Sequence, residues 1–321
     1  MKINFRNIRF RSKVGIAIIF FLSFFVSAQS PSIKLGVLKG ISCAPCAYLI
    51  ENKEKLSVQN MNFQIFDSPQ SELPKFLRGE LDICFLSTKD AAKVFEKSDK
   101  KIVFLAVAQN ENAYLLTNDE TYGSLEDLKG KTIICPQKTS SETTLFNHIL
   151  TKKEILSDST ENSEISVKFD FSLPQANFAN SLITGKSSYA IISEPYASVA
   201  LLHSSKTVRA ENLQKIYYEL EESRSVPKML LVARTDFVKT NRDLVRRFLD
   251  LYKNAVQWTN KNPSKAALLI EKHGLGLSFV IAKNSIPNSG LVFRESTIAK
   301  SDLEKYLTLM KRTLPTEEFY F

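Results

Sequence analysis

The stretch FLRGELDICFLS, residues 76–87, has a counterpart of the same build in LITGKSSYAIIS, residues 182–193. In both, a helix-like run reaches a glycine (Gly79 or Gly185), a short polar step follows, and an apolar strand ends on a serine at the same spacing. Glycine suits the left-handed cap of a helix, and a mostly apolar strand suits a buried place in a sheet. Two such units predict an α/β protein of two similar lobes, each a mixed, mainly parallel sheet flanked by helices.

Residues 1–28 have the pattern of a secretory signal peptide. Basic residues precede an apolar core at 14–26, and Ser27 and Ala28 suit cleavage before Gln29. The core is shorter than the roughly 20 residues of a membrane span, although an uncleaved anchor is the alternative. We therefore expect a periplasmic or otherwise extracytoplasmic protein. Any α/β protein repeats helix–glycine–strand units, and export is what favours the two-lobed interpretation.

Composition points away from nucleic acid. The chain carries 43 Lys and Arg against 34 Asp and Glu, and without the five basic residues of the signal the balance is 38 against 34. These charges are scattered and form no basic tract interleaved with aromatics, so we expect no nucleic-acid partner. The length beyond the signal suffices for two ordinary domains. We expect a monomer whose first lobe spans 29–114 and 228–321 and whose second lobe spans 115–227.

Periodicity and turn signals predict the elements. Strands are expected at 33–38, 62–66, 82–86, 102–107, 113–117, 131–135, 165–169, 189–192 and 229–233, and helices at 45–56, 71–78, 89–97, 139–151, 174–184, 263–272 and 301–312. Thr88 is expected to cap the helix at 89–97, and Ser124 with Asp127 has the spacing of a capping box. From Asp236 the chain turns helical, with one apolar face at Leu244, Phe248, Tyr252, Ala255 and Thr259.

Cys43 and Cys46 form a Cys-x-x-Cys motif at an expected helix start. In that setting a thiolate pKa can fall and redox chemistry becomes available, whereas in an exported protein a structural disulfide is the simpler account. Cys84 and Cys135 lie at apolar strand positions and are expected to be small buried thiols.

Catalytic and metal signatures are absent from the sequence. The three histidines are far apart and lack metal-ligand spacing, there is no Gly-x-Ser-x-Gly elbow, and no carboxylate pair suits hydrolysis. We therefore expect no catalytic residue, no metal and no cofactor, and binding rather than catalysis.

Loops that follow strands and open helices are the candidate binding residues. Hydroxyls and free amides at helix starts bind polar or anionic groups, although plain capping is the alternative at each loop. Glu194 could accept from a ligand donor or cap the helix starting at Pro195, and Tyr196 suits a flat molecule. The candidate ligand-binding residues are Gly40, Ile41, Ser42, Ser87, Thr88, Thr139, Ser140, Ser141, Glu194 and Tyr196.

Six stretches resemble the solute-binding proteins of ABC transporters, of the nitrate, sulfonate and taurine type. They lie at 34–40, 45–49, 79–82, 124–132, 193–197 and 245–249, and SLEDLKGKT at 124–132 and SEPYA at 193–197 are the most specific. The resemblance runs from about residue 33 to the C-terminus. It implies a type II periplasmic-binding-protein fold, two lobes that close on a ligand at a hinge.

The resemblance implies that the ligand-facing loops of the family correspond by position to the same loops here: residues 40–42, 87–88, 139–141 and Glu194. Cys43 and Cys46 depart from the family pattern. A disulfide between them would stiffen the first loop, whereas a pair of free thiols could bind a soft metal. Family members take oxyanions, sulfonates or pyrimidine-like vitamin precursors. Hydroxyls and amides suit an anion, whereas Glu194, Tyr48 and Tyr196 favour a flat organic molecule with a donor group.

The expected function is capture of a small polar or anionic molecule by hinge closure and delivery to an ABC permease in the inner membrane. Two alternatives remain at this stage: an exported thiol-disulfide oxidoreductase using Cys43 and Cys46, and a small-molecule enzyme on the same two-lobed fold.

Overall fold

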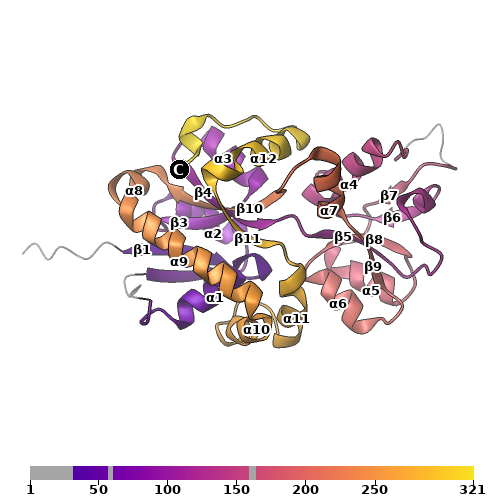
Figure 1. Ribbon diagram of the computed structural model, residues 1–321, viewed down its shortest axis with the longest axis horizontal. Helices are drawn as coiled ribbons and strands as arrows, with labels where there is room; N and C mark the ends of the chain where they lie inside the picture. The colour runs from indigo at the N-terminus through magenta and orange to yellow at the C-terminus, as the bar shows by residue number, and fades with distance from the viewer. Residues whose placement is uncertain (1–31, 57–60, 159–163) are drawn as a thin grey trace, which may run out of the picture. The chain divides into compact units, whose positions relative to one another are not determined.

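Two sheets carry the strands of the computed structural model, which describes residues 32–56, 61–158 and 164–321 (Figure 1). The first has the order β11-β4-β10-β3-β1-β2 and the second β7-β6-β8-β5-β9. The first sheet consists of β1 Ile33–Leu38, β2 Met61–Phe66, β3 Ile83–Ser87, β4 Ile102–Asn110, β10 Pro227–Arg234 and β11 Leu291–Glu295. The second consists of β5 Ala113–Thr117, β6 Thr132–Ile134, β7 Lys168–Asp170, β8 Tyr189–Ser193 and β9 Val208–Asn212. The expected signal peptide lies outside the described residues.

Both sheets are mixed. In the first sheet β1 is parallel to β2 and β3, whereas β10 is antiparallel to β3 and β4. In the second, β6 is parallel to β7 and β8, and β5 is antiparallel to β8 and β9. The predicted α/β class with two mixed sheets is confirmed.

Helices flank both sheets. They are α1 Ala44–Glu51, α2 Pro69–Leu77, α3 Thr88–Lys97, α4 Ser141–Lys152, α5 Phe178–Ile183, α6 Tyr196–His203, α7 Leu213–Glu221, α8 Thr235–Thr240, α9 Arg242–Lys261, α10 Pro263–Lys272, α11 Phe279–Ser285 and α12 Ser296–Leu309. The predictions for β1 and α10 match at both ends, and α1 ends five residues earlier than expected. The elements β9, α7, α11 and β11 were not predicted.

One predicted cap is wrong and one is confirmed. Ser87 rather than Thr88 caps α3: its Oγ accepts from the backbone N–H of Asp90 at 3.1 Å, and Thr88 is already the first helical residue. The Asp127 carboxylate accepts from the backbone N–H of Ser124 at 2.9 Å, so the capping box forms, ahead of a single 3₁₀ turn at Leu125–Leu128.

The second sheet is covered on both faces, which explains the continuous apolar run of β8. Ile191 packs in a cluster with Leu145 and Phe146 of α4, and Ile192 packs in another with Phe178 of α5. Successive strand residues point to opposite faces, so a strand buried on both faces needs apolar residues throughout.

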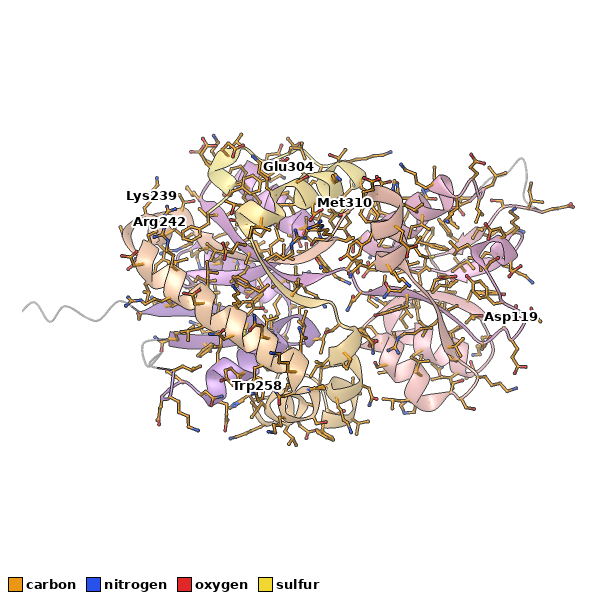
Figure 2. All side chains as sticks on the ribbon, in the orientation of Figure 1. Asp119, Lys239, Arg242, Trp258, Glu304 and Met310 are labelled. Carbon is orange, nitrogen blue, oxygen red and sulfur yellow. The ribbon has the colours of Figure 1, made fainter. Side chains whose placement is uncertain are left out.

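The face of α9 packs against the first sheet and α1. Phe248, Tyr252, Ala255 and Thr259 are buried as predicted, while Leu244 is only partly buried. Trp258, labelled in Figure 2, packs against Tyr48 of α1 with ring centroids 4.5 Å apart and ring planes tilted by 34°. The aromatic pair therefore joins α9 to the helix that follows β1.

The first lobe buries one carboxyl group in its core. Glu72 of α2 has no exposed surface, and neither of its carboxyl oxygens has a hydrogen-bond partner of good geometry among the described residues. A Cβ added at Gly36 of β1 would come within 2.4 Å of its Oε1, so the glycine makes room for the carboxyl. Burial raises the pKa of Glu72 to about 8, and the nearby backbone of Phe85 offsets only part of that rise.

We expect Glu72 to make the protein less stable as the pH rises from about 4.5 to about 8. The unfolded chain releases this proton near its ordinary value of 4.5, whereas the folded protein holds it until about 8, so rising pH favours the unfolded state across that interval. Urea unfolding of the protein and of Glu72→Gln, followed by circular dichroism from pH 4.5 to 8.5, measures the difference in slope.

Glu54→Gln is the matched control, because Glu54 is exposed in the same lobe. Its stability should follow that of the unchanged protein at every pH. Parallel curves for the unchanged protein and Glu72→Gln would contradict a protonated, buried Glu72.

Candidate functional site

The chain passes between the two sheets at two adjoining segments. Glu111 and Asn112 connect β4 to β5, and residues 222–226 lead from α7 back to β10. The backbone N–H of Glu111 donates to the carbonyl of Val226 at 2.7 Å, so the two segments are hydrogen-bonded to each other. We call residues 110–112 and 222–228 the crossing.

A third segment closes on the crossing before β11. The backbone N–H of Asn110 donates to the carbonyl of Gly290 at 2.8 Å. Gly290 has a φ of +70°, and a Cβ there would lie 2.8 Å from the carbonyl oxygen of Asn110. Glycine is needed both for the left-handed backbone and for the close approach. From the second sheet, the hydroxyl of Tyr114 donates to the carbonyl of Asn288 at 2.8 Å, which adds a contact between the two lobes.

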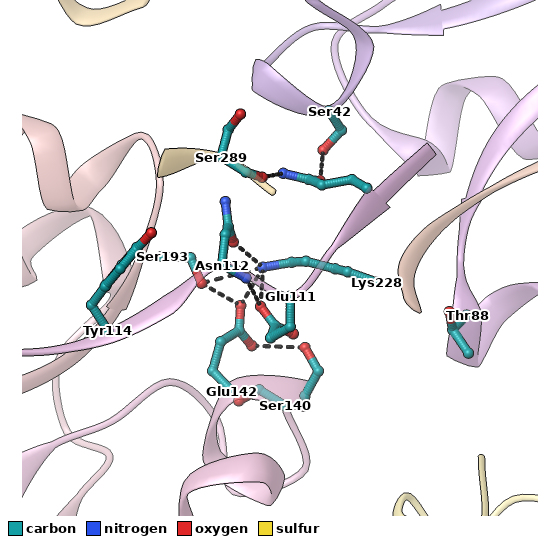
Figure 3. A network of polar contacts seen from close by, with 12 residues as sticks. Ser42, Thr88, Glu111, Asn112, Tyr114, Ser140, Glu142, Ser193, Lys228 and Ser289 are labelled. Carbon is teal, nitrogen blue, oxygen red and sulfur yellow. Dashed lines mark hydrogen bonds and ion pairs between the residues drawn. The ribbon is translucent and has the colours of Figure 1, made fainter. Parts of the chain in front are cut away.

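Lys228 is the centre of a polar network at the crossing (Figure 3). Its Nζ lies 2.8 Å from Glu111 Oε1 and 3.0 Å from Glu142 Oε1. It also donates to Asn112 Oδ1 at 3.1 Å and to Ser193 Oγ at 3.2 Å. Lys228 belongs to β10 of the first sheet, while Glu142 and Ser193 belong to α4 and β8 of the second lobe. The Lys228 network, defined by these five residues, therefore joins both sheets.

Lys228 and Glu142 hold each other ionised. Burial acts to raise the pKa of Glu142, but the Lys228 ammonium and its hydrogen bonds outweigh burial and lower that pKa to about 2. Burial acts to lower the pKa of Lys228, and the Glu111 and Glu142 carboxylates raise it above its ordinary value. The ammonium and the Glu142 carboxylate therefore persist across the physiological pH range.

Four predicted hydroxyl residues lie around the network. Ser42 Oγ donates to Gln109 Oε1 at 2.6 Å (Figure 3), and Thr88 Oγ1 donates to the carbonyl of Pro227. Ser141 Oγ donates to Glu142 Oε2 at 3.1 Å. Ser140 caps α4, where its Oγ accepts from the backbone N–H of Thr143 at 3.1 Å. The structure thus brings residues of three predicted loops to one region.

The other predicted binding residues are placed differently. Gly40 has a φ of +121°, Ile41 is buried in the core, Ser87 is used as the cap of α3, and Thr139 is exposed.

Glu194 is satisfied within its own lobe. Its carboxylate accepts from the backbone N–H of Ser198 at 3.1 Å, in the first turn of α6, and pairs with Arg209 of β9. This is the local capping role that the sequence left open, extended by an ion pair. Tyr196 is 38% exposed at the start of α6. Both carboxylate oxygens of Glu194 therefore have partners within their own lobe.

Cys43 and Cys46 are free thiols in the structure, and both are completely buried. Burial raises the pKa of the Cys43 and Cys46 thiols far from the range in which a thiolate forms at neutral pH. Across the described ranges, no group of three or more His, Cys, Asp and Glu side chains is arranged to hold a metal ion. In the same part of the chain no helix is long and apolar enough to cross a membrane.

A family model described as NMT1/THI5 like matches residues 68–266, which is more than half of the 321 residues. This chain belongs to the NMT1/THI5-like family. A curated relative, YtlA of Bacillus subtilis (strain 168), is 25% identical over 169 residues, 52% of this chain. The chain spans about half of that relative, 46% of its length.

Solved structures share the fold of this NMT1/THI5-like chain. An ABC transporter protein from Parabacteroides distasonis superposes with a TM-score of 0.75 at 18% identity, covering 91% of this chain and 99% of the other. The periplasmic aliphatic sulphonate binding protein SsuA from Escherichia coli gives 0.65 at 14% identity, covering 91% and 92%. The periplasmic nitrate-binding protein NrtA from Synechocystis PCC 6803 gives 0.58 at 13% identity, covering 88% and 81%.

The predicted resemblance to ABC-transporter solute-binding proteins of the sulfonate and nitrate type is confirmed by these matches. Their names describe those proteins, and at 13–18% identity the likeness to this chain is one of fold. The type II periplasmic-binding-protein fold is likewise confirmed.

Sequence reasoning missed the members of the Lys228 network. Glu111, Asn112 and Lys228 lie at or beside the expected lobe boundaries, 114–115 and 227–228, and polar residues between apolar strands were a usable signal. Ser193 was noticed as a strand end but not as a network residue. Glu142 directly follows Ser141, a predicted ligand-binding residue, but its position inside an expected helix gave no sign of a network role.

We expect Lys228→Met in this NMT1/THI5-like protein to lower the free energy of unfolding by about 3–5 kcal/mol. The substitution leaves the buried Glu111 carboxylate and the nearly buried Glu142 carboxylate without their cation, and breaking one side of a buried ion pair has costs of that order. Urea unfolding at pH 7 measures the change. Lys215→Met, at an exposed position of α7, should change stability by no more than about 0.5 kcal/mol. Equal effects of the two substitutions would contradict the importance of the network.

We also expect Glu142 to contribute stability that is lost in acid. Its pKa is about 2 in the folded protein against an ordinary 4.5, so the contribution is complete above about pH 4.5 and disappears as the pH falls toward 2. Other carboxylates titrate in the same interval, so the measured quantity is the difference in unfolding free energy between the protein and Glu142→Gln. That difference should shrink steadily from pH 5 to pH 2.5, and a constant difference would rule out the lowered pKa.

Proposed function

We propose that this protein is an exported solute-binding protein of an ABC importer, which captures a small polar molecule between its two lobes. The observation that carries the proposal is the Lys228 network, because its members come from both lobes and meet where the chain crosses between them. Hydroxyls of three strand-end loops lie around the same place, at Ser42, Thr88 and Ser141. In open α/β sheets, ligands bind beyond the carboxyl ends of strands.

The mechanism is hinge closure about the crossing. Two short connections that are hydrogen-bonded to each other allow two sheets to rotate as bodies while few backbone angles change. A solute that touches residues of both lobes stabilises the closed form by the difference between its affinities for the closed and open forms. The closed form is then the one that a membrane permease recognises.

The family and the similar structures support this proposal. SsuA is named as a sulphonate-binding protein and NrtA as a nitrate-binding protein, so small solutes are the class of ligand to test first. The sequence favours an organic molecule over a simple oxyanion. The signal-like pattern at 1–28 supports export, and fractionation of cells followed by immunoblotting would detect the protein outside the cytoplasm. A cytoplasmic location would favour the enzyme alternative.

The thiol oxidoreductase alternative receives no support from the geometry. Cys43 and Cys46 have no exposed surface, so a disulfide substrate has no access to either sulfur. Their raised thiol pKa values also disfavour the thiolate nucleophile.

The test is thermal unfolding of residues 29–321 with oxyanions, sulfonates, amino acids and pyrimidine or thiamine precursors. A ligand at about 100 times its Kd adds about 2.7 kcal/mol to the stability of the folded protein, which raises the melting temperature by several degrees. Ser42→Ala should weaken the response to the ligand found, because it removes a hydroxyl beside the network. Ser71→Ala, on the exposed surface of α2, should respond like the unchanged protein. No response to any class of solute would count against the proposal.

A further inference from the structure

The Lys228 network carries a net charge of −1. Both oxygens of Glu111 accept hydrogen bonds. Its Oε1 accepts from Lys228 Nζ and from the backbone N–H of Asn112, and its Oε2 accepts from the hydroxyl of Tyr306. Both oxygens of Glu142 likewise accept, from Lys228 and Ser193 at one and from Ser141 at the other. Both carboxyl groups accept at both of their oxygens, which is the hydrogen-bond pattern of an ionised, acceptor-only carboxylate. One ammonium therefore faces two carboxylates.

Other cations do not balance this charge. Among the residues that the structure describes, Lys228 is the cation in contact with Glu111 and Glu142. Arg209, in the second lobe, is paired with Glu194 and lies over the ring of Tyr114, 5.1 Å from its centroid. Its charge is therefore compensated by Glu194, and the excess negative charge stays at the crossing.

Asn112 supplies one unused donor at the same place. Its side chain is 3% exposed, and its Nδ2 has no hydrogen-bond partner. The orientation of the amide is fixed chemically, because Lys228 can only donate and must therefore face the oxygen. Figure 3 shows the amide nitrogen directed away from Lys228, on the side of Ser289.

An unused donor at this depth points to a ligand. A buried polar group without a partner costs folding free energy, so most such groups are paired, and the exceptions call for an explanation. Asn112 lies on the two-residue connection between β4 and β5, where both lobes are within reach. A hydrogen-bond acceptor on a bound solute would give Asn112 Nδ2 the partner that it lacks.

We infer that the solute carries no net negative charge and presents a hydrogen-bond acceptor, such as a carbonyl oxygen, to Asn112 Nδ2. The inference rests on the proposed function and narrows it to uncharged or cationic polar molecules. A monoanion about 6 Å from one uncompensated negative charge binds about 100-fold more weakly than its neutral analogue, at the effective dielectric constant of about 20 that suits protein sites. Free nitrate, sulfate and sulfonates are therefore expected to bind about 100-fold more weakly than uncharged analogues.

The experiment measures Kd by isothermal titration calorimetry for two sets of probes. Sodium nitrate, sodium sulfate and sodium ethanesulfonate form the anionic set; urea, nicotinamide, cytosine and choline form the uncharged and cationic set. The purified protein is expected to bind at least one member of the second set and none of the first below 1 mM, about −4.1 kcal/mol. Asn112→Asp, which replaces the donor by an acceptor, should weaken that binding at least 10-fold.

Asn284→Asp is the matched control, since Asn284 is exposed on α11 and bonds within its own helix. It should bind as the unchanged protein does. Circular dichroism of both variants identifies any that is misfolded, and the measurements on the unchanged protein do not depend on them.

The outcomes separate the inference from the proposed function. Micromolar binding of nitrate, sulfate or ethanesulfonate would overturn the charge inference and leave a solute-binding protein in place. Binding of an uncharged probe with equal affinity by Asn112→Asp would overturn the role of Asn112. No binding of either set would count against the inference and the proposed function together.

Discussion

One ammonium group, that of Lys228, holds together the parts of the molecule that the sequence separates. Its partners lie 117, 86 and 35 residues away along the chain, at Glu111, Glu142 and Ser193. The side chain is only 20% exposed, so removing it leaves carboxylates in a place where water cannot replace the lost charge. The network extends to α12 as well, because Tyr306 donates to Glu111 and packs in the core cluster of the second sheet.

Most polar side chains at the strand ends serve the fold before they serve a ligand. Ser87 caps α3, Ser140 caps α4, and the Glu194 carboxylate accepts from the first turn of α6. Each hydroxyl or carboxylate satisfies a backbone N–H that would otherwise lack a partner at a helix start. The exception is Asn112, whose amide nitrogen is buried and unused. A polar residue at a strand end is thus weak evidence for binding, and an unsatisfied one is stronger evidence.

Local signals decided how much of the fold could be predicted. The ends of α10 were predicted because Pro263 begins the helix and a glycine follows shortly after it, and β1 was predicted from an apolar run. The strand β9, VRAEN, was missed because it is short, polar and only partly buried, and a strand at the edge of a sheet needs no apolar pattern. The cap of α3 was misplaced by one residue because Ser87 and Thr88 are both suitable caps by type.

The site was less predictable than the fold, for a physical reason. Loops at strand ends could be placed by topology alone, and Ser42, Thr88 and Ser141 do contact residues at or beside the crossing and its network. The charged residues of the Lys228 network could not be predicted, because Lys228 lies within an apolar strand and Glu142 within an ordinary amphipathic helix. Pairing of distant charges depends on the three-dimensional crossing of the chain, and no spacing in the sequence encodes it.

For a hinge of the proposed kind, the network has a fixed half and a movable half. Glu111 and Lys228 lie on or beside the crossing, whose two segments are hydrogen-bonded to each other, so their pairing persists when the lobes rotate. Glu142 and Ser193 belong to α4 and β8, and rotation of the second lobe changes their distance from Lys228. The contacts of the movable half join β10 to α4 and β8, so they form only in arrangements that bring the second lobe against β10. A solute that bridges the two lobes then shifts the equilibrium toward the closed form by the difference between its affinities for the closed and open forms.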